Sequence, residues 1–172
     1  MPKILNNLRE QLLEETRREI RERGYKATTI RSVAAACHVA VGTVYNYFAS
    51  KSAMISSYME EDWRRLTEKV RATDTRDKKA YLSTIDRSLR EFASLHSPLF
   101  HDPDAEKEFS EASSKLHPEL RKQLSGLILP VLSGVKKEEQ GFLSQFLAES
   151  ILTWSMSSVA FETLYAVIEK LI

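Results

Sequence analysis

Apolar residues recur three and four positions apart along most of the 172-residue chain, with polar residues between them. This spacing places the apolar side chains on one face of a helix and is typical of helices that pack around a shared core. Alternation of the kind found in strands is scarce, and the chain holds only five glycines and five prolines. The pattern therefore predicts an all-α protein.

The amino-terminal third predicts a long first helix, two short helices and a second long helix. The first is expected over about residues 2–23. Its apolar face holds Ile4, Leu8, Leu12 and Ile20. Gly24 is expected to end it, because glycine tolerates a positive φ. The second long helix is expected over about 51–71, with Ser50 as its cap.

The remaining two-thirds predicts five more helices separated by breaks. The expected order is a polar break at 73–77, a helix through Leu82 and Phe92, a connector at 96–103, a helix over about 105–116, a helix opened by Pro118, a charged turn at 136–141, and final helices at about 140–156 and 160–172. Pro130 is expected to kink the helix that Pro118 opens, because proline lacks the N–H that a helix uses.

The segment 28–51, TTIRSVAAACHVAVGTVYNYFASK, predicts two short helices joined by a tight turn. Thr28 or Thr29 is expected to cap the first. The apolar sets of the two helices are Ile30, Val33, Ala34 and Cys37, and then Val44, Tyr47 and Phe48. Small residues gather where the helices cross, as a steep crossing angle requires. This geometry is a helix-turn-helix, whose second helix lies in the major groove of DNA.

The net charge changes sign along the chain. Residues 1–51 hold nine Lys and Arg against five Asp and Glu, a net +4, whereas residues 52–172 hold sixteen against nineteen, a net −3. A basic amino-terminal third suits a surface that faces phosphates. The single Cys37 excludes an internal disulfide. No apolar run approaches the roughly 20 residues of a membrane span, and the charged amino terminus is not a signal peptide. We therefore expect a cytoplasmic protein.

These residues resemble the TetR family of bacterial one-component transcriptional regulators. The likeness runs from about residue 13 to residue 58 and rests on Gly24-Tyr25, Ala27-Thr28-Thr29, Val33-Ala34, Gly42-Thr43-Val44-Tyr45, Tyr47-Phe48 and Ser50-Lys51. The resemblance implies about nine helices. It also implies an amino-terminal three-helix helix-turn-helix DNA-binding domain over 1–50. The carboxy-terminal helical bundle, 51–172, is then expected to bind a small effector and to form a homodimer.

The resemblance and the side-chain chemistry together assign ten candidate DNA contacts. They are Thr28, Thr29, Arg31, Val41, Gly42, Thr43, Tyr45, Asn46, Tyr47 and Lys51. Thr29 begins a helix, where the helix dipole favours a phosphate. Asn46 is the candidate for base reading, since an amide pairs bidentately with adenine. The competing interpretations are that Tyr45 or Tyr47 packs the three-helix core, as Phe48 does, and that Arg31 lies on a solvated helix face.

Two features depart from the family pattern. His38 stands where the turn usually has glycine, at a position that takes the left-handed conformation. Ala40 and Val41 stand where a capping serine and a polar or basic residue are usual. The recognition helix therefore lacks a cap worth about 1 kcal/mol. Val41 is expected to pack on a thymine methyl instead.

Large apolar side chains between residues 63 and 154 are the candidates for an effector pocket. They are Trp63, Tyr81, Ile85, Phe92, Phe109, Leu127, Val131, Phe146 and Trp154, with Glu149 beside them. For each one, ordinary core packing is the competing interpretation. The last two helices carry more apolar surface than one helical pair hides, which favours a two-fold interface over a self-contained pair.

We therefore expect a ligand-responsive transcriptional regulator, a repressor, that binds a palindromic operator as a homodimer and is released by a small effector. The alternative is a protein-binding adaptor that contacts a partner protein through the helix-turn-helix, which the apolar Ala40-Val41 pair favours. No enzyme is expected, because no nucleophile, base and orienting group recur at a recognisable spacing. No cofactor or metal is expected either, since the cluster of His96, His101, Asp102 and Asp104 matches no established metal-site spacing.

Overall fold

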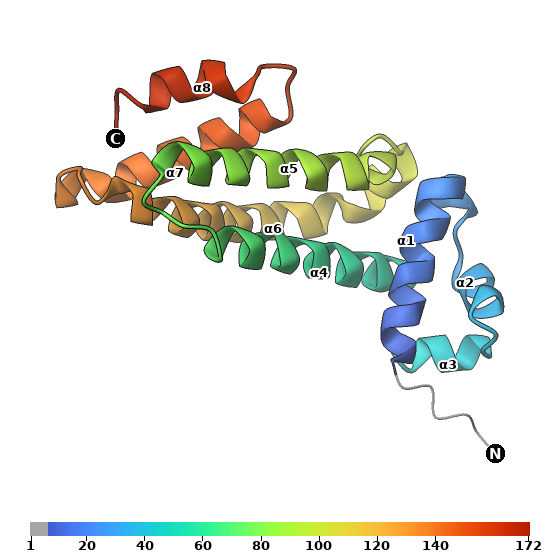
Figure 1. Ribbon diagram of the computed structural model, residues 1–172. Helices are drawn as coiled ribbons and strands as arrows, with labels where there is room; N and C mark the ends of the chain where they lie inside the picture. The colour runs from blue at the N-terminus through green and yellow to red at the C-terminus, as the bar shows by residue number, and fades with distance from the viewer. Residues whose placement is uncertain (1–6) are drawn as a thin grey trace. The chain divides into compact units, whose positions relative to one another are not determined.

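The computed structural model describes residues 7–172, except for the side chains of 110–117. The described part is all helical, as predicted. Its elements are α1 (Leu8–Ala27), α2 (Ile30–Ala36), α3 (Val41–Tyr45), α4 (Lys51–Arg71), α5 (Lys78–Phe100), α6 (Pro103–Ile128), the 3₁₀ helix η1 (Leu129–Leu132), α7 (Lys137–Ser155) and α8 (Phe161–Ile168) (Figure 1). The predicted amino-terminal helix-turn-helix is present as α2 and α3.

The chain packs into two compact units that do not follow a single cut in the sequence. One consists of residues 1–62 and 95–110, and the other of 63–94 and 111–172. The helices α4 and α5 therefore each contribute residues to both units. The expected assignment of DNA binding to 1–50, and of effector binding and dimerisation to 51–172, concerns function and stays a prediction.

The amino-terminal unit has a core built from one face of each of its helices. Leu12, Leu13, Val33, Val44 and Ile55 are each at most 1% exposed and meet in this core. Ion pairs join α1 to α4 at its edge, from Arg9 to Glu61 and from Arg17 to Asp62. Burying the apolar faces provides most of the stabilisation, and the ion pairs fix how α1 lies along α4.

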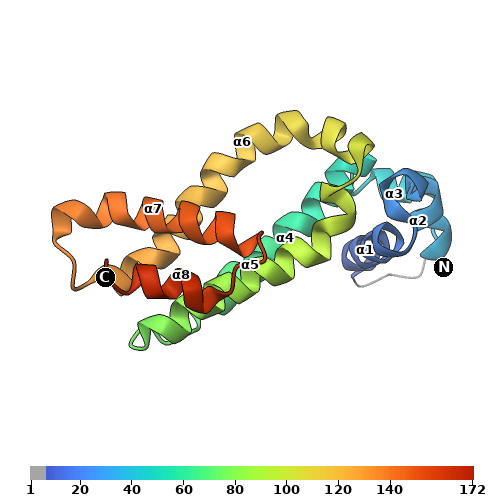
Figure 2. The ribbon, with the colours of Figure 1, turned by 90° about the horizontal axis from the view of Figure 1, so that it is seen from above.

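The carboxy-terminal unit has a second core, formed by α4 after residue 62, α5, α6, η1, α7 and α8. Figures 1 and 2 show α7 and α8 side by side. Arg90 of α5 holds their connection, because its guanidinium donates to the carbonyl oxygens of Ser157, at 2.8 Å, and Val159, at 2.7 Å. Asp86 holds the same guanidinium from within α5, at 2.9 Å.

Local chemistry explains the helix ends that the sequence predicted in the amino-terminal third. Gly24 interrupts α1 with φ 80. Thr29 caps α2, and the Ser50 hydroxyl accepts the N–H of Ala53 at 3.0 Å at the start of α4. In the described residues α1 begins at Leu8, after Asn7 with φ 82, and the expected start near residue 2 lies outside them. Ile4 lies outside the described residues.

Several predicted breaks in the carboxy-terminal two-thirds are wrong. The expected connector at 96–103 is mostly helical, because α5 continues through Pro98 to Phe100. Pro118 does not open a helix but lies inside α6. The charged segment 136–141 is largely the first turn of α7, where Glu138 and Glu139 suit the positive end of the helix dipole. Pro130 does not kink a continuing helix, since α6 ends at Ile128 and gives way to η1.

Candidate functional site

The start of α2 is fixed by a reciprocal cap. Ser32 N donates to the Thr29 hydroxyl and Thr29 N donates to the Ser32 hydroxyl, both at 2.9 Å. The Ser32 hydroxyl also bonds to Glu19 of α1 at 2.5 Å. The Thr29 amide, expected at a phosphate, is thus used within the cap. The amides of Ile30 and Arg31 have by position no acceptor in the helix.

The turn between α2 and α3 has the conformation that the sequence predicted. His38 has φ 56, in the left-handed region. The N–H groups of His38 and Val39 donate to Ala35 and Ala34 carbonyls at 3.1 and 2.9 Å, which holds the turn on the end of α2. Ala40 begins α3 in extended conformation with no side-chain cap. The recognition helix is therefore short and weakly capped at its amino terminus.

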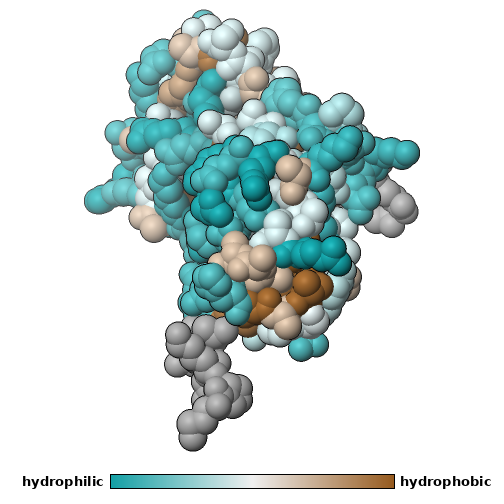
Figure 3. Space-filling model, turned by 90° about the vertical axis from the view of Figure 1, so that its right-hand side faces the viewer, coloured by the Kyte–Doolittle hydropathy of each residue, from teal (hydrophilic) through white to brown (hydrophobic). Residues whose placement is uncertain are grey.

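The helix α3 and the residues just after it have two distinct faces. Val44 and Phe48 are 0% and 3% exposed and pack into the core, whereas Tyr45 and Tyr47 are 54% and 46% exposed. Asn46, between the two tyrosines, is exposed as well. The structure thus places both tyrosines on the surface rather than in the three-helix core. The face that carries α2 and α3 is mostly hydrophilic, with an apolar cluster in its lower part (Figure 3).

Gly42 and Thr43 lie on the first turn of α3. Gly42 is exposed, and a Cβ built on it would meet no heavy atom within 4 Å. The backbone is therefore open to a close approach from outside. Val41, beside them, is half-buried and packs against the core of the amino-terminal unit.

Six of the ten candidate DNA contacts line one hollow of about 400 Å³. They are Thr28, Thr29, Arg31, Val41, Tyr45 and Lys51, together with Ile30, which was expected only in the apolar set of α2 and not as a DNA contact. Gly42, Thr43, Asn46 and Tyr47 lie outside it. Nothing in the sequence indicated that Ile30 lines this hollow, because its apolar side chain belongs to the core. Ile30 lines the hollow because it is the first residue of α2.

Two residues of this hollow are already engaged within the protein. Thr28 is fully buried, and its hydroxyl donates to the Gly24 carbonyl oxygen at 2.9 Å. The Lys51 ammonium donates to the Tyr25 carbonyl oxygen at 2.6 Å and lies 3.5 Å from the centre of the Tyr25 ring. Burial lowers the pKa of Lys51, and the carboxylates of Asp102, Glu108 and Asp104 act in the opposite direction.

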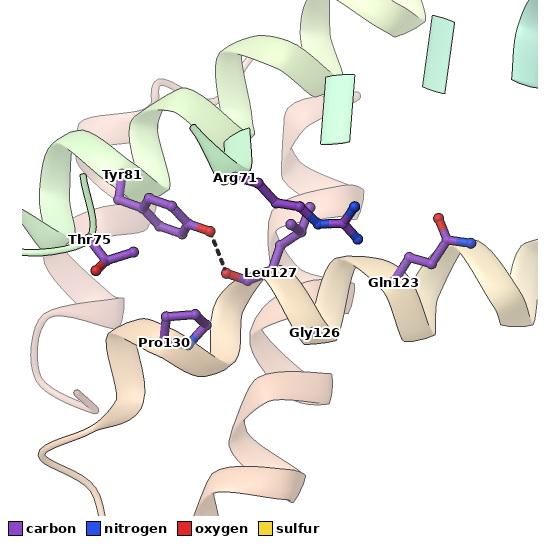
Figure 4. Close-up of a pocket in the computed structure, with 7 residues that line it drawn as sticks. All are labelled: Arg71, Thr75, Tyr81, Gln123, Gly126, Leu127 and Pro130. Carbon is purple, nitrogen blue, oxygen red and sulfur yellow. Dashed lines mark hydrogen bonds between the residues drawn. The ribbon is translucent and has the colours of Figure 1, made fainter. Parts of the chain in front are cut away.

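The ten effector-pocket candidates do not meet in one place. Tyr81 and Leu127 line a second hollow, of about 300 Å³, in the carboxy-terminal unit (Figure 4). Its other lining residues are Arg71, Thr75, Gln123, Gly126 and Pro130. Only large apolar side chains were expected to line an effector pocket, so the polar lining residues were not predicted. No spacing in the sequence links residues 71 and 75 to residues 123 and 126.

The remaining effector candidates have other positions. Ile85 and Val131 are core residues, and Trp63 packs edge-on against Phe92, with ring centres 5.7 Å apart. Phe109 belongs to the amino-terminal unit and packs against Tyr25. Phe146 and Trp154 are exposed, and Glu149 forms an exposed ion pair with Arg121. These positions give the eight residues no common cavity.

The histidines and carboxylates near residue 100 are dispersed. His96 is buried in α5, stacked on Tyr58 and 3.2 Å from Asp62. The His101 ring bonds to the Ser97 carbonyl oxygen, and the Asp102 carboxylate accepts N–H groups at the start of α6. No group of three or more His, Cys, Asp or Glu side chains with metal-site geometry occurs among the described residues.

The comparisons with known proteins agree with this architecture. Residues 12–58 match the model of bacterial regulatory proteins, tetR family. A transcriptional regulator from Rhodococcus sp. RHA1 superposes with a TM-score of 0.66 at 16% identity, over 92% of this chain and 87% of that one. One from Aquifex aeolicus VF5 gives 0.66 at 13% identity, over 95% and 99%. A TetR/AcrR regulator from Thermobifida fusca YX-ER1 gives 0.65 at 16% identity, over 96% of each chain. No curated protein matches the chain.

The helix-turn-helix and the match over residues 12–58 define an amino-terminal DNA-binding domain, and the chain has the fold of solved transcriptional regulators. The amino-terminal domain is thus similar to that of TetR family regulators, and the whole chain shares the fold of a solved TetR/AcrR regulator. None of the helices in the described ranges is long and apolar enough to cross a membrane.

Proposed function

We propose that this regulator represses transcription by binding a palindromic operator as a homodimer, and that a small effector releases it. The observation that carries the proposal is the division of α3 and its end into two faces. Val44 and Phe48 anchor it in the core, while Tyr45, Asn46 and Tyr47 remain exposed beside one another. A recognition helix needs this arrangement, because its inner face must hold it rigidly while its outer face enters the major groove.

The hollow beside α2 supports contact with the phosphate backbone. Arg31 and Lys51 supply positive charge there, and Tyr45 also lines the hollow. Most protein–DNA hydrogen bonds go to phosphates and fix the register of the protein on the duplex. In this arrangement Asn46 is left to read base edges, with adenine as its best partner.

The surface of α7 supports dimerisation. Phe142 and Phe146 are 75% and 48% exposed, with ring centres 6.2 Å apart. Exposed, adjacent aromatic rings at helical spacing are typical of a protein–protein interface. Part of the apolar surplus predicted for the last two helices is used within the unit, since Leu147, Phe161, Leu164 and Ile168 are buried in its own core.

Release would proceed by a population shift. The helix α4 contributes residues to both units, so an effector bound in the carboxy-terminal unit has a continuous element on which to act. Two recognition helices must lie about 34 Å apart to occupy both half-sites of an operator. An effector that binds better to a form with a different separation therefore lowers operator affinity. Repression as the direction of control agrees with one solved structure of this fold, AlkX from Dietzia sp., which is described as a TetR family repressor.

The test is selection of bound duplexes from a random DNA pool at moderate salt, with the full chain. We expect an enriched palindrome. The matched variant is Asn46→Ala, which should still bind DNA but lose preference at one base pair per half-site, at a cost of about 1–3 kcal/mol. No enrichment at any salt concentration, in protein shown to be folded and dimeric, would overturn the proposal and favour the protein-binding adaptor.

A further inference from the structure

The hollow of about 300 Å³ in the carboxy-terminal unit has a floor and a rim of different chemistry. It is bounded by the end of α4, the start of α5 and the end of α6 (Figure 4). Such a volume lies at the lower end of the usual range for small-molecule sites. A hollow of this volume suits a small molecule.

The floor is apolar and rigid. Tyr81 and Leu127 are 2% and 4% exposed, and the Tyr81 hydroxyl donates to the Leu127 carbonyl oxygen at 2.8 Å. This bond satisfies the hydroxyl and fixes the aromatic ring. A ligand would therefore meet an apolar floor. It would not need to form a hydrogen bond with a buried polar group there.

The rim presents hydrogen-bond donors. The Trp63 indole, which only donates, bonds to Gln123 Oε1 at 2.8 Å and thereby fixes the Gln123 amide nitrogen on the other side. One N–H of that nitrogen reaches Glu119 at 3.3 Å, which leaves the second N–H to donate. Thr75 also lines the hollow.

Arg71 supplies the only charge among the residues that line this hollow. No hydrogen bond or ion pair joins its guanidinium to a described residue, whereas Arg64, Arg76 and Arg90 in the same unit each pair with a carboxylate. Its charge also acts within the hollow. Burial raises the pKa of the Tyr81 hydroxyl, and Arg71 opposes that rise.

We propose that this hollow binds a small carboxylate with a short aliphatic or aromatic body, and that such a compound is the effector. The carboxylate accepts from Arg71, whose guanidinium pairs with a carboxylate through two parallel bonds, and from Gln123. The body of the ligand lies on Tyr81 and Leu127. That the bound carboxylate acts as the effector rests on the proposed function, whereas its binding to the hollow does not.

The test uses the full chain and compounds matched in size. Hexanoate and benzoate are compared with hexanamide and hexylamine by calorimetric titration and by thermal unfolding. We expect both carboxylates to bind and to raise Tm, and the neutral and cationic compounds to bind at least tenfold more weakly. Arg71→Gln should weaken carboxylate binding at least tenfold, and Arg71→Lys should weaken it less, because the charge remains.

A second variant tests the location independently of charge. Gly126 lines the hollow, and a Cβ built on it meets no heavy atom within 4 Å, so we expect the larger side chain of Gly126→Leu to occupy part of the hollow. Leucine also favours a helix more than glycine does, so the variant should fold. We expect Gly126→Leu to lose carboxylate binding while its Tm without ligand is unchanged or higher.

Equal binding of hexanamide or hexylamine, unchanged affinity in Arg71→Gln or Gly126→Leu, or no binding of either carboxylate would overturn the inference. The duplex selection described above, run without these compounds, keeps the two proposals apart. An enriched palindrome without carboxylate binding would overturn only the proposal that the effector is a carboxylate. Carboxylate binding without recognition of any duplex removes the operator function and leaves the binding site.

Discussion

The two cations beside α2 differ in how freely they meet an anion. Lys51 is held by the Tyr25 carbonyl oxygen, whereas Arg31 is exposed and has no hydrogen bond or ion pair with a described residue. Arg31 can therefore pair with a phosphate without first giving up a contact within the protein. Neutralising a phosphate releases a counterion, and this release makes affinity depend on salt.

Replacing Arg31 should therefore weaken DNA binding without affecting the fold. We expect Arg31→Gln to lower affinity for all duplexes alike and to reduce the slope of log affinity against log salt by about 1. Fluorescence anisotropy at several salt concentrations measures both quantities. Arg21→Gln is the matched control, because Arg21 is an exposed arginine of α1 that does not line the hollow. An equal loss of slope in the control would attribute the effect to net charge and not to a contact.

For single residues, the sequence predicted the exposure of Tyr45, Asn46 and Tyr47 but little of the second hollow. A short helix-turn-helix has local geometry, so the position of Tyr45 or Asn46 follows from its distance to the turn. The hollow at Arg71 joins residues about 50 positions apart, and it depends on how α4, α5 and α6 pack. Periodicity indicates which face of a helix is buried, but not which neighbour it meets.

The recognition helix offers a test at the scale of an element. Ala40 has the extended conformation of a capping residue, with φ −69 and ψ 146, but no side-chain acceptor. Ala40→Ser should supply one to the first turn of α3 and raise the free energy of unfolding by about 1 kcal/mol. Chemical denaturation measures the change. Ala35→Ser, at an exposed position inside α2, should give no gain, because an interior serine does not cap. Equal stability of Ala40→Ser and the parent protein would contradict this account.

Three helices of the amino-terminal unit meet at one carboxylate. Asp62 of α4 lies 2.9 Å from the Arg17 guanidinium of α1 and 3.2 Å from the His96 ring of α5. The Asp62 and Arg17 side chains are only 9% and 11% exposed. Burial alone would raise the pKa of Asp62, but hydrogen bonds and charges from His96 and Arg17 outweigh it and hold the pKa below the ordinary 3.8.

This junction predicts a pH dependence of stability. A carboxyl whose pKa is lower in the folded state stabilises the fold above its unfolded pKa, and the contribution is lost as pH falls through the folded value. Asp62→Asn should lower the free energy of unfolding by about 3 kcal/mol at pH 7, since it removes the buried partner of Arg17 and leaves only the exposed Glu14 to pair with it. Below pH 3.8 the difference from the parent protein should shrink. Urea titrations from pH 7 to pH 3 measure it.

The control for this prediction shares the same arginine. Arg17 also pairs with Glu14, whose side chain is 68% exposed. Because exposed ion pairs contribute little, Glu14→Gln should cost less than about 0.5 kcal/mol. A cost for Asp62→Asn as small as that for Glu14→Gln would show that the junction does not hold α1, α4 and α5 together.

The helix boundaries show where sequence patterns succeed and where they fail. Caps and glycines act within one turn, so the starts of α2 and α4 were predicted closely. Prolines were overrated as breaks. Pro98 and Pro118 each remove one N–H, but a helix continues past that loss when its flanking turns are packed, as with Leu99, which is 4% exposed.

For the whole molecule, the untested expectation with the largest consequence is the homodimer. A single helix-turn-helix reads one half-site, so recognition of a palindrome requires two chains. In the carboxy-terminal unit, Phe142 and Phe146 form the exposed aromatic pair on α7. Because both rings are exposed, the core of the unit does not depend on them. A substitution at Phe142 or Phe146 should therefore change association without changing folding.

Phe142→Glu should therefore yield a folded monomer. An unpaired charge in a closed interface costs about 3 kcal/mol or more, which weakens association at least a hundredfold. Sedimentation equilibrium measures the association, and circular dichroism checks the helix content. Phe100→Glu is the control, since Phe100 is 47% exposed but lies on α5. If Phe142→Glu associates as tightly as the parent protein and the control, α7 is not the interface. If it is a monomer, its affinity for the palindrome should fall to that for an isolated half-site, because the second recognition helix is no longer held in register with the first.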